Sequence, residues 1–334
     1  MKILKQIAIL FFLAASTTFA QSEVSKISSR PGAFGRMGFG ARGIGMGNAM
    51  SGVIHGNISS YYNPALSPFQ SGNSFQTGYS FLSLDRSLNF LSFTKNFEFG
   101  KKKDNAGNVK PRSTAGLSIG LINAGVSDIQ ERDNQGNLTD ELSTSENMAY
   151  LGLSTRFSEK VAIGITIKFF YYKLYEDLTS TGVGLDIGAL YLLNDNITLS
   201  FLFSDLNSKY DWDSNELYGQ SGTSIEERFP VRKTFGITYK LNEPNIILAA
   251  EVENSNAETT YLRFGAEYNL YDGLFLRGGM DRLNLSNSDF PVRPSLGFSY
   301  FYNWNSVKLG VDYAFVVEPY SSSDQHIIGV TINF

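Results

Sequence analysis

The feature that most constrains this chain is a succession of segments between residues 75 and 334 in which apolar residues alternate with small or polar ones. In residues 161–172, the two alternating sets are Val161, Ile163, Ile165, Ile167, Phe169 and Tyr171 on one side, and Ala162, Gly164, Thr166, Lys168, Phe170 and Tyr172 on the other. Neighbouring side chains of a β-strand point to opposite faces. The pattern therefore predicts strands with one apolar face.

Soluble β-sandwiches also alternate in this way, so strand length and the placement of aromatic residues must separate the two folds. The segments run for about 9–11 residues, the length of a tilted strand that crosses a bilayer. Aromatic residues gather at segment ends, as at Tyr171, Tyr191 and Tyr300. After the leader, no apolar run approaches the roughly 18 residues of a spanning helix. Because unpaired amides are costly in hydrocarbon, we predict an all-β fold, a closed transmembrane antiparallel β-barrel.

We expect about fourteen strands in this barrel. Their approximate spans are 74–84, 87–97, 114–125, 148–157, 161–172, 181–192, 197–206, 231–241, 245–253, 259–269, 274–280, 293–302, 307–315 and 326–334. Tight turns at one end have suitable Asn, Asp, Gly or Pro chemistry, at 158–160, 194–196, 242–244, 271–273 and 303–306. Longer connectors at the other end are expected at 126–147, 207–230, 281–292 and 316–325. The long 98–113 link falls at the short-turn end and does not fit this asymmetry.

The first 20 residues have the pattern of a secretory signal peptide. Lys2 and Lys5 precede a short apolar core at 7–15, and Thr18-Phe19-Ala20 offers a cleavage site with small residues. The core is too short for a spanning helix, although an N-terminal membrane anchor is the alternative. We expect cleavage after Ala20 and export to the outer membrane of a Gram-negative-type bacterium.

Charge and composition exclude several classes of function. Without the two leader lysines, 26 of the 28 basic residues face 32 acidic ones, a net charge of −6. Nucleic-acid binding needs clustered basic residues, so we expect none. The chain has no cysteine and only two histidines, His55 and His326. Thiolate chemistry is excluded and a zinc site is not expected; we predict no cofactor, no metal and no enzymatic activity.

Three matches to known sequence patterns are rejected from their context. Residues 38–43 match a dinucleotide fingerprint, but no strand precedes them and no βαβ pattern follows. Residues 116–120 match a nucleophile elbow, yet Ser118 lies within an alternating strand and is not paired with a histidine. Residues 211–222 begin like a calcium loop but have Glu216 and Gly222 at positions that need Gly and Glu. A solvated acidic loop is the simpler interpretation.

Residues 32–72 do not alternate and carry glycines at 38, 40, 43, 45 and 47. The stretch Gly-Ala-Arg-Gly-Ile-Gly-Met-Gly at 40–47, followed by Asn63-Pro64-Ala65, resembles the N-terminal hatch of FadL-type outer-membrane proteins. Residues 276–279 and 310–315 look like the shorter PorV/PorQ branch. The resemblance implies a fourteen-stranded barrel whose N-terminal segment folds into the lumen as a plug. Its hatch motif would comprise Gly40, Gly43, Gly45, Gly47, Asn63, Pro64 and Ala65. A disordered glycine-rich leader is the alternative.

The predicted organisation is a signal peptide at 1–20, a hatch at 21–73 and a barrel at 74–334. Charged residues on inward faces should form salt-bridged networks: Lys168, Asp186, Arg263, Glu267, Lys308 and Asp312. At the C-terminus, Val330, Ile332 and Phe334 share one face. The barrel-insertion machinery reads such aromatic-terminated strands, so these three residues are the predicted insertion signal.

The leading functional hypothesis is passive, FadL-like uptake or binding of hydrophobic small molecules across the outer membrane. The resemblance implies capture near the external loops and release by movement of the plug around Asn63-Pro64-Ala65. An alternative is a PorV/PorQ-like accessory of type IX protein secretion, a cargo shuttle or a member of the surface attachment complex. A purely structural barrel is a third option. Expected partners are outer-membrane lipid, the insertion machinery, and a hydrophobic ligand or secreted protein cargo.

Overall fold

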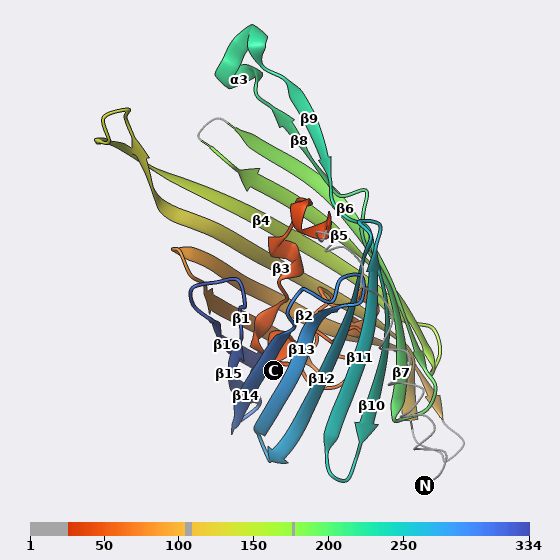
Figure 1. Cartoon of the computed structure of the whole chain (residues 1–334). Helices are drawn as coiled ribbons and strands as arrows, with labels where there is room; N and C mark the ends of the chain where they lie inside the picture. Colours follow the sequence, from red (N-terminus) through yellow and green to blue (C-terminus); the bar gives the residue numbers. More distant parts are fainter. Residues whose placement is uncertain (1–25, 104–108, 176–177) are drawn as a thin grey trace.

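The computed structural model describes residues 26–103, 109–175 and 178–334. Fourteen antiparallel strands close into one barrel, in which the first strand pairs with the last (Figure 1). This confirms the predicted fold class. The predicted signal peptide at 1–20 lies outside the described residues. Within the described ranges, no helix is long and apolar enough to cross a membrane.

Each predicted strand has a counterpart in the barrel. The bounds are β1 (Asn73–Phe81), β2 (Arg86–Lys103), β3 (Val109–Arg132), β4 (Leu138–Arg156), β5 (Val161–Lys173), β6 (Thr179–Leu192), β7 (Ile197–Leu206), β10 (Arg232–Leu241), β11 (Ile246–Ser255), β12 (Thr259–Tyr271), β13 (Leu274–Asn284), β14 (Arg293–Trp304), β15 (Val307–Val316) and β16 (Gln325–Asn333). The tight turns expected at one end are present. In the described residues before β1 there are four short helical elements, η1 (Lys26–Ser29), η2 (Phe34–Arg36), α2 (Gly40–Gly45) and η3 (Pro64–Phe69).

The alternation of the sequence becomes the two faces of the wall. On β5, Ile163, Ile165 and Phe169 are exposed on the outer face, whereas Thr166 and Lys168 are buried on the inner face. The other strands repeat this arrangement, so an apolar belt surrounds the barrel. The belt can face lipid because all charged side chains that are buried point the other way.

The ends of the chain close the cylinder. β1 and β16 pair along eight positions, from Ser74↔Asn333 to Phe81↔His326. Beyond this ladder, the amide of Phe334 donates to the carbonyl of Asn73 at 3.0 Å and the reverse bond is 2.9 Å. Val330 and Phe334 are exposed on the outer face and Ile332 is half-buried. The three residues thus share a face, while their role in insertion stays a prediction.

Two predicted connectors are wrong, because the strands continue through them. β2, β3 and β4 have 18, 24 and 19 residues, so most of 98–113 and of 126–147 is strand. The outer β3–β4 hairpin continues to pair beyond its neighbours and projects from the barrel in Figure 1. Its turn is held by Asp133, whose Oδ1 accepts from the amides of Gln135 (2.8 Å) and Asn137 (2.9 Å). The strand pattern was hidden there because neither face of this hairpin is buried.

The predicted loop at 207–230 is also structured. It folds into β8 (Lys209–Asp213), α3 (Asn215–Tyr218), η4 (Gly219–Ser221) and β9 (Ser224–Arg228), with β8 and β9 paired in a separate two-stranded sheet. Tyr210 is fully buried against Phe170 and Phe229, and its ring centroid lies 4.9 Å from that of Phe229. This aromatic contact anchors the hairpin to the barrel.

Candidate functional site inside the barrel

The candidate site is the segment before β1 together with the inner wall that it touches. α2 contacts β13, β14, β15, β16 and β1, whereas η3 contacts β2 to β6. The segment therefore spans the lumen from one side of the wall to the other. Its aromatic residues pack against each other, with Phe39 and Tyr61 at 5.4 Å and Tyr61 and Tyr62 at 4.9 Å between ring centroids.

Glycine is required at the positions of the predicted hatch motif for different physical reasons. Gly40 and Gly47 adopt positive φ angles of 67° and 59°, which L-residues with side chains disfavour. A Cβ on Gly43 would lie within 3.0 Å of Tyr62, and one on Gly47 would lie within 3.0 Å of the backbone of Met280. Gly45 lies against Gly297 of β14, because a Cβ added to Gly45 would be 3.4 Å from the Cα of Gly297. The chain thus approaches the wall at backbone distance.

Asn63, Pro64 and Ala65 form the start of η3. Asn63 Oδ1 accepts from the amide of Ala65 at 3.0 Å, a side-chain cap of the helix. Asn63 Nδ2 donates to the carbonyl of Ser51 at 3.0 Å, so the same side chain joins the two halves of the segment. Wall glycines make room for this turn, since a Cβ on Gly188 or Gly164 would lie within 3.0 Å of Asn63 or Pro64.

Arg42 of α2 joins the segment to the wall by charge. Its Nε and Nη2 donate to the two carboxylate oxygens of Glu267 at 2.8 and 2.7 Å, and its Nη1 donates to Asn57 O at 2.7 Å. Glu267 also accepts from Arg277 Nε at 2.5 Å. All three charged side chains are less than a tenth exposed. Two-pronged Arg–carboxylate pairs are among the stronger polar contacts in a buried setting.

A second chain of ion pairs follows the inner wall from β5 to β13. Lys168 pairs with Asp186 (2.7 Å) and Asp205 (2.9 Å). Arg232 joins Asp205 to Glu253, and Arg263 joins Glu253 to Asp281. Five of the six inward charges named from the sequence thus lie in ion-pair networks, including Asp312, which lies 3.8 Å from Arg277. The sixth, Lys308, instead lies over the ring of Phe301 at 5.1 Å.

The serine and the two histidines considered for catalysis lie apart in the described structure. Ser118 is buried inside the barrel and hydrogen-bonds Thr94 at 2.9 Å. His326 lies on the outer face and hydrogen-bonds Tyr313 at 2.8 Å, on the far side of the wall from Ser118. His55 lies in the inner segment, where burial and then Lys240 and Arg42 lower its pKa to about 4. In the described part of the chain, no three His, Asp or Glu side chains are grouped to hold a metal ion.

Two cavities open at opposite ends of the lumen. The outer cavity, about 280 Å³, is lined by Arg36 and Met37 and by residues at the long-connector end such as Arg86. The inner cavity, about 360 Å³, is lined by Arg42 and His55 and by residues at the tight-turn end such as Phe301. Among the described residues, none lines both cavities. A space of about 40 Å³ near Tyr61 and Tyr62 adjoins the outer cavity. The N-terminal segment separates the two.

The arginines of this interior were mostly missed from the sequence. The inward charges named from the sequence did not include Arg36, Arg232, Arg277 and Arg293. Each of these arginines lines a cavity or forms an ion pair. For the three in strands, a charged residue at an inward position of the alternation was the available signal. Arg36 lies outside any strand pattern, so only the folded chain brings it to the lumen.

Comparison with known proteins places the fold. No family model and no curated protein sequence matches this chain. Among solved structures it is similar to the Pseudomonas putida toluene transporter TodX, with a TM-score of 0.57, 14% identity, and 88% of this chain and 96% of that chain covered. It is also similar to the monoaromatic hydrocarbon channel CymD, with a TM-score of 0.60, 15% identity, and 89% of this chain and 98% of that chain covered. A Pseudomonas aeruginosa FadL homologue has a TM-score of 0.54 and 11% identity, with 89% of this chain and 98% of that chain covered.

At these identities the likeness is one of fold. The chain shares the barrel fold of these structures, which agrees with the fold that the sequence resemblance implies and fits an outer-membrane location. The narrower PorV/PorQ resemblance stays a prediction.

Proposed function

We propose that this protein is an outer-membrane channel that allows passive passage of hydrophobic or amphipathic small molecules. In this proposal residues 26–72 act as the plug and the apolar outer belt contacts lipid. The observation that carries it is the pair of cavities at opposite ends of a FadL-type barrel, separated by a segment that spans the lumen. Two structures of similar fold are a toluene transporter and a monoaromatic hydrocarbon channel, which supports the same class of function.

Passage requires the segment to move, and the contacts identify where. Between the cavities, the segment is attached to the wall by Arg42 on one side and by Asn63 and Pro64 on the other. Neither attachment is covalent, so a shift of the segment can join the cavities while the barrel stays closed. No energy source is needed for such a shift.

The test is uptake into lipid vesicles that contain the purified protein. Toluene, an alkane and a fatty acid should enter faster than into protein-free vesicles. Arg42→Gln weakens the attachment to Glu267 and should change the uptake rate, whereas Arg112→Gln, an exposed arginine at the tight-turn end, should not. Equal uptake with and without protein, together with absence of binding, would refute the proposal.

The secretion-accessory alternative needs a protein partner instead of a small ligand. The projecting β3–β4 hairpin is the described feature that favours it, since its strand edges beyond Val126 and Ser145 are not paired to β2 or β5. Co-purification of a secreted protein with the barrel, lost when residues 128–142 are shortened, would favour this function. Loss of uptake with retained secretion would favour the channel.

A further inference from the structure

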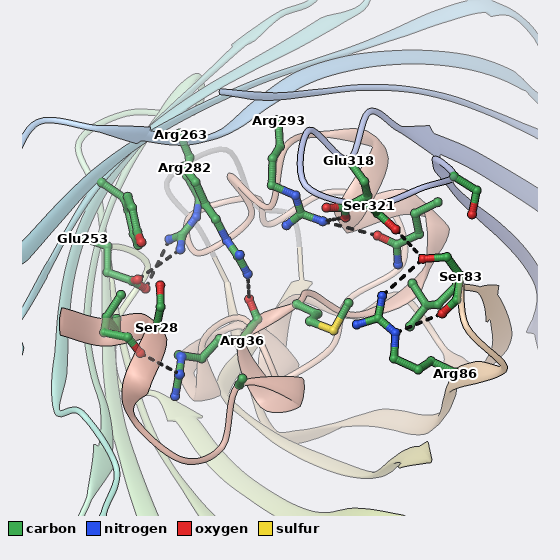
Figure 2. A pocket seen from close by; sticks show the side chains of 17 residues that line it. Ser28, Arg36, Ser83, Arg86, Glu253, Arg263, Arg282, Arg293, Glu318 and Ser321 are labelled. Carbon is green, nitrogen blue, oxygen red and sulfur yellow. Dashed lines mark hydrogen bonds and ion pairs between the residues drawn. The ribbon is translucent and has the colours of Figure 1, made fainter. Parts of the chain in front are cut away.

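The outer cavity has an unusual excess of positive charge. Its lining includes the arginines Arg36, Arg86, Arg263, Arg282 and Arg293, but the carboxylates of Glu253 and Glu318 alone. Figure 2 shows these side chains around one opening, with Arg282 directed toward the main chain of Arg36. Adding Asp281 and Glu251, which both pair with Arg263 behind the lining, still leaves one more positive than negative group.

The hydrogen bonds show which arginines lack a carboxylate. Arg36 donates to the carbonyls of Pro31 (2.6 Å), Arg30 (3.1 Å) and Ile27 (3.2 Å). Arg86 donates to the backbone and hydroxyl of Ser83. These contacts orient the guanidinium groups without neutralising them. Arg282 donates to Arg36 O at 3.1 Å and lies 3.6 Å from Asp281.

Two further observations suit the binding of an anion by the arginines of the outer cavity. Arg293 is only 9% exposed, yet its Nε has no hydrogen-bond partner among the described residues. A buried donor without a partner is costly, and it leaves the guanidinium of Arg293 incompletely hydrogen-bonded beside the cavity. In addition, burial and then the charge of Arg232 lower the pKa of Arg36 to about 10. An anion in the cavity would relieve that repulsion.

We propose that the outer cavity is a binding site for a phosphate monoester group. A phosphate monoester carries a charge of roughly −1.5 to −2 and three acceptor oxygens, which suits a lining of five guanidinium groups and two carboxylates. Two parallel N–H donors of one guanidinium group can bind two of these oxygens at once. A carboxylate has two oxygens and one charge, so it can bind fewer of the guanidinium groups. The apolar part of the ligand would contact Ile27, Met37 and Leu82, which are among the apolar residues of the lining.

The site is independent of the proposed channel function, because binding can be measured without transport. The phosphate group could come from a free solute or from the headgroup of a lipid, since the cavity opens at the end of the barrel with the long connectors. The chemistry recognised is the same in both cases, and the two sources differ only in the carbon chain attached to the phosphate.

The experiment is calorimetric titration of the purified protein in detergent micelles. The probes are glycerol phosphate, acetate, and phosphatidic acid mixed into the micelles. A phosphate probe should bind more tightly than acetate. Arg86→Gln and Arg282→Gln should each weaken binding by about tenfold, the effect of one charged hydrogen bond. The matched control is Arg132→Gln, an exposed arginine of the β3–β4 hairpin outside the cavity, which should leave binding unchanged.

The outcomes separate cleanly. Binding of glycerol phosphate identifies a free solute as a sufficient ligand, and binding of phosphatidic acid alone identifies a lipid headgroup; both support the site. Acetate binding as tightly as phosphate would overturn the assignment of a doubly charged group. Absence of binding by both phosphate probes, or equal affinity in the two cavity variants and the control, would overturn the site itself. Retained heat-modifiable mobility in gels would show that each variant is folded.

Discussion

The two sides of the lumen hold the N-terminal segment by different physics. Around η3, the buried polar residues of β2, β3 and β4 in the described ranges are all serine or threonine: Ser92, Thr94, Thr114, Ser118 and Ser154. We call this side the hydroxyl wall. Around α2, the buried residues of β11 to β15 include Glu251, Glu253, Arg263, Glu267, Arg277, Asp281 and Asp312. We call this side the charged wall. The hydroxyl wall holds the segment by close packing, and the charged wall holds it by ion pairs.

The two walls would lose their hold on the segment in different ways. At the hydroxyl wall, backbone lies directly against glycines, so any added atom must displace the segment. At the charged wall, each ion is shared by several partners, so removing one leaves others buried and uncompensated. A segment that must move would be expected to release on one side first. The following substitutions test which side is stronger.

The largest effect is expected at the charged wall. Glu267→Gln removes the carboxylate shared by Arg42 and Arg277 and leaves two buried cations without it. Breaking a buried pair costs about 3–5 kcal/mol, so docking of α2 should weaken by this order. Hydrogen exchange of residues 40–48 measures the loss. Glu258→Gln, which breaks the exposed pair with Lys26, is the control and should cost under about 1 kcal/mol. Unchanged exchange in Glu267→Gln would mean that charge does not hold α2.

A smaller loss is expected at the hydroxyl wall. A Cβ on Gly116 would lie within 3.0 Å of the main chain of Ser67 and Pro68, so Gly116→Ala must push η3 away. Overpacking of this kind costs about 1–3 kcal/mol. Protease cleavage within residues 58–70 should become faster. In Gly278→Ala, the added atom has its nearest neighbour at 3.7 Å, so this variant should match the wild type. If both variants behave alike, close packing is not what seats η3.

The cap of η3 should contribute less. Asn63→Ala loses the bond from the Ala65 amide and the donation to Ser51. Loss of an N-cap costs about 0.5–2 kcal/mol. Exchange of the Ala65 amide should accelerate while exchange of the strand amides stays constant. Asn134→Ala in the exposed β3–β4 turn serves as the comparison. A faster exchange throughout the barrel would show that Asn63 stabilises the wall and not the segment.

The last effect is a dependence on pH, which is small near neutral pH and grows as the pH falls. Burial, Lys240 and Arg42 lower the pKa of His55 to about 4 from 6.5, although Glu267 acts in the opposite direction. The released segment therefore binds a proton more readily than the docked one, and docking weakens as pH falls from 6.5 to about 4. Above pH 6.5 the effect disappears. Segment exchange measured across this range should show the slope, and His55→Asn should flatten it.

Much of the barrel could be predicted because its pattern is local. Residues 161–172 display both faces of β5 without any tertiary contact, and the turn residues at 158–160 and 194–196 mark where strands end. The outer part of the β3–β4 hairpin, within residues 126–147, was not predicted for the opposite reason. Its two faces are both solvated, so no alternation distinguishes it from a loop. The β8–β9 hairpin depends on Tyr210 reaching Phe170 and Phe229, contacts that no local pattern records.

The candidate site could be predicted in part. The inward charges Lys168, Glu267 and Asp312 followed from alternation, but the pairing of particular residues did not. Arg42 lies in a glycine-rich stretch without strand pattern, and its carboxylate partner is 225 residues away in sequence. The outer cavity similarly joins Arg36, Arg86 and Arg293 from three separate parts of the chain.

Side-chain periodicity and the need to pair every amide in lipid were enough to predict the fourteen barrel strands, their apolar outer face and the closed all-β class. The positions of residues 26–72 against the wall, the ions that share partners and the arginines that line the outer cavity became known from the folded chain alone. Those features depend on the curvature and register of the closed barrel, which bring distant residues within hydrogen-bond reach.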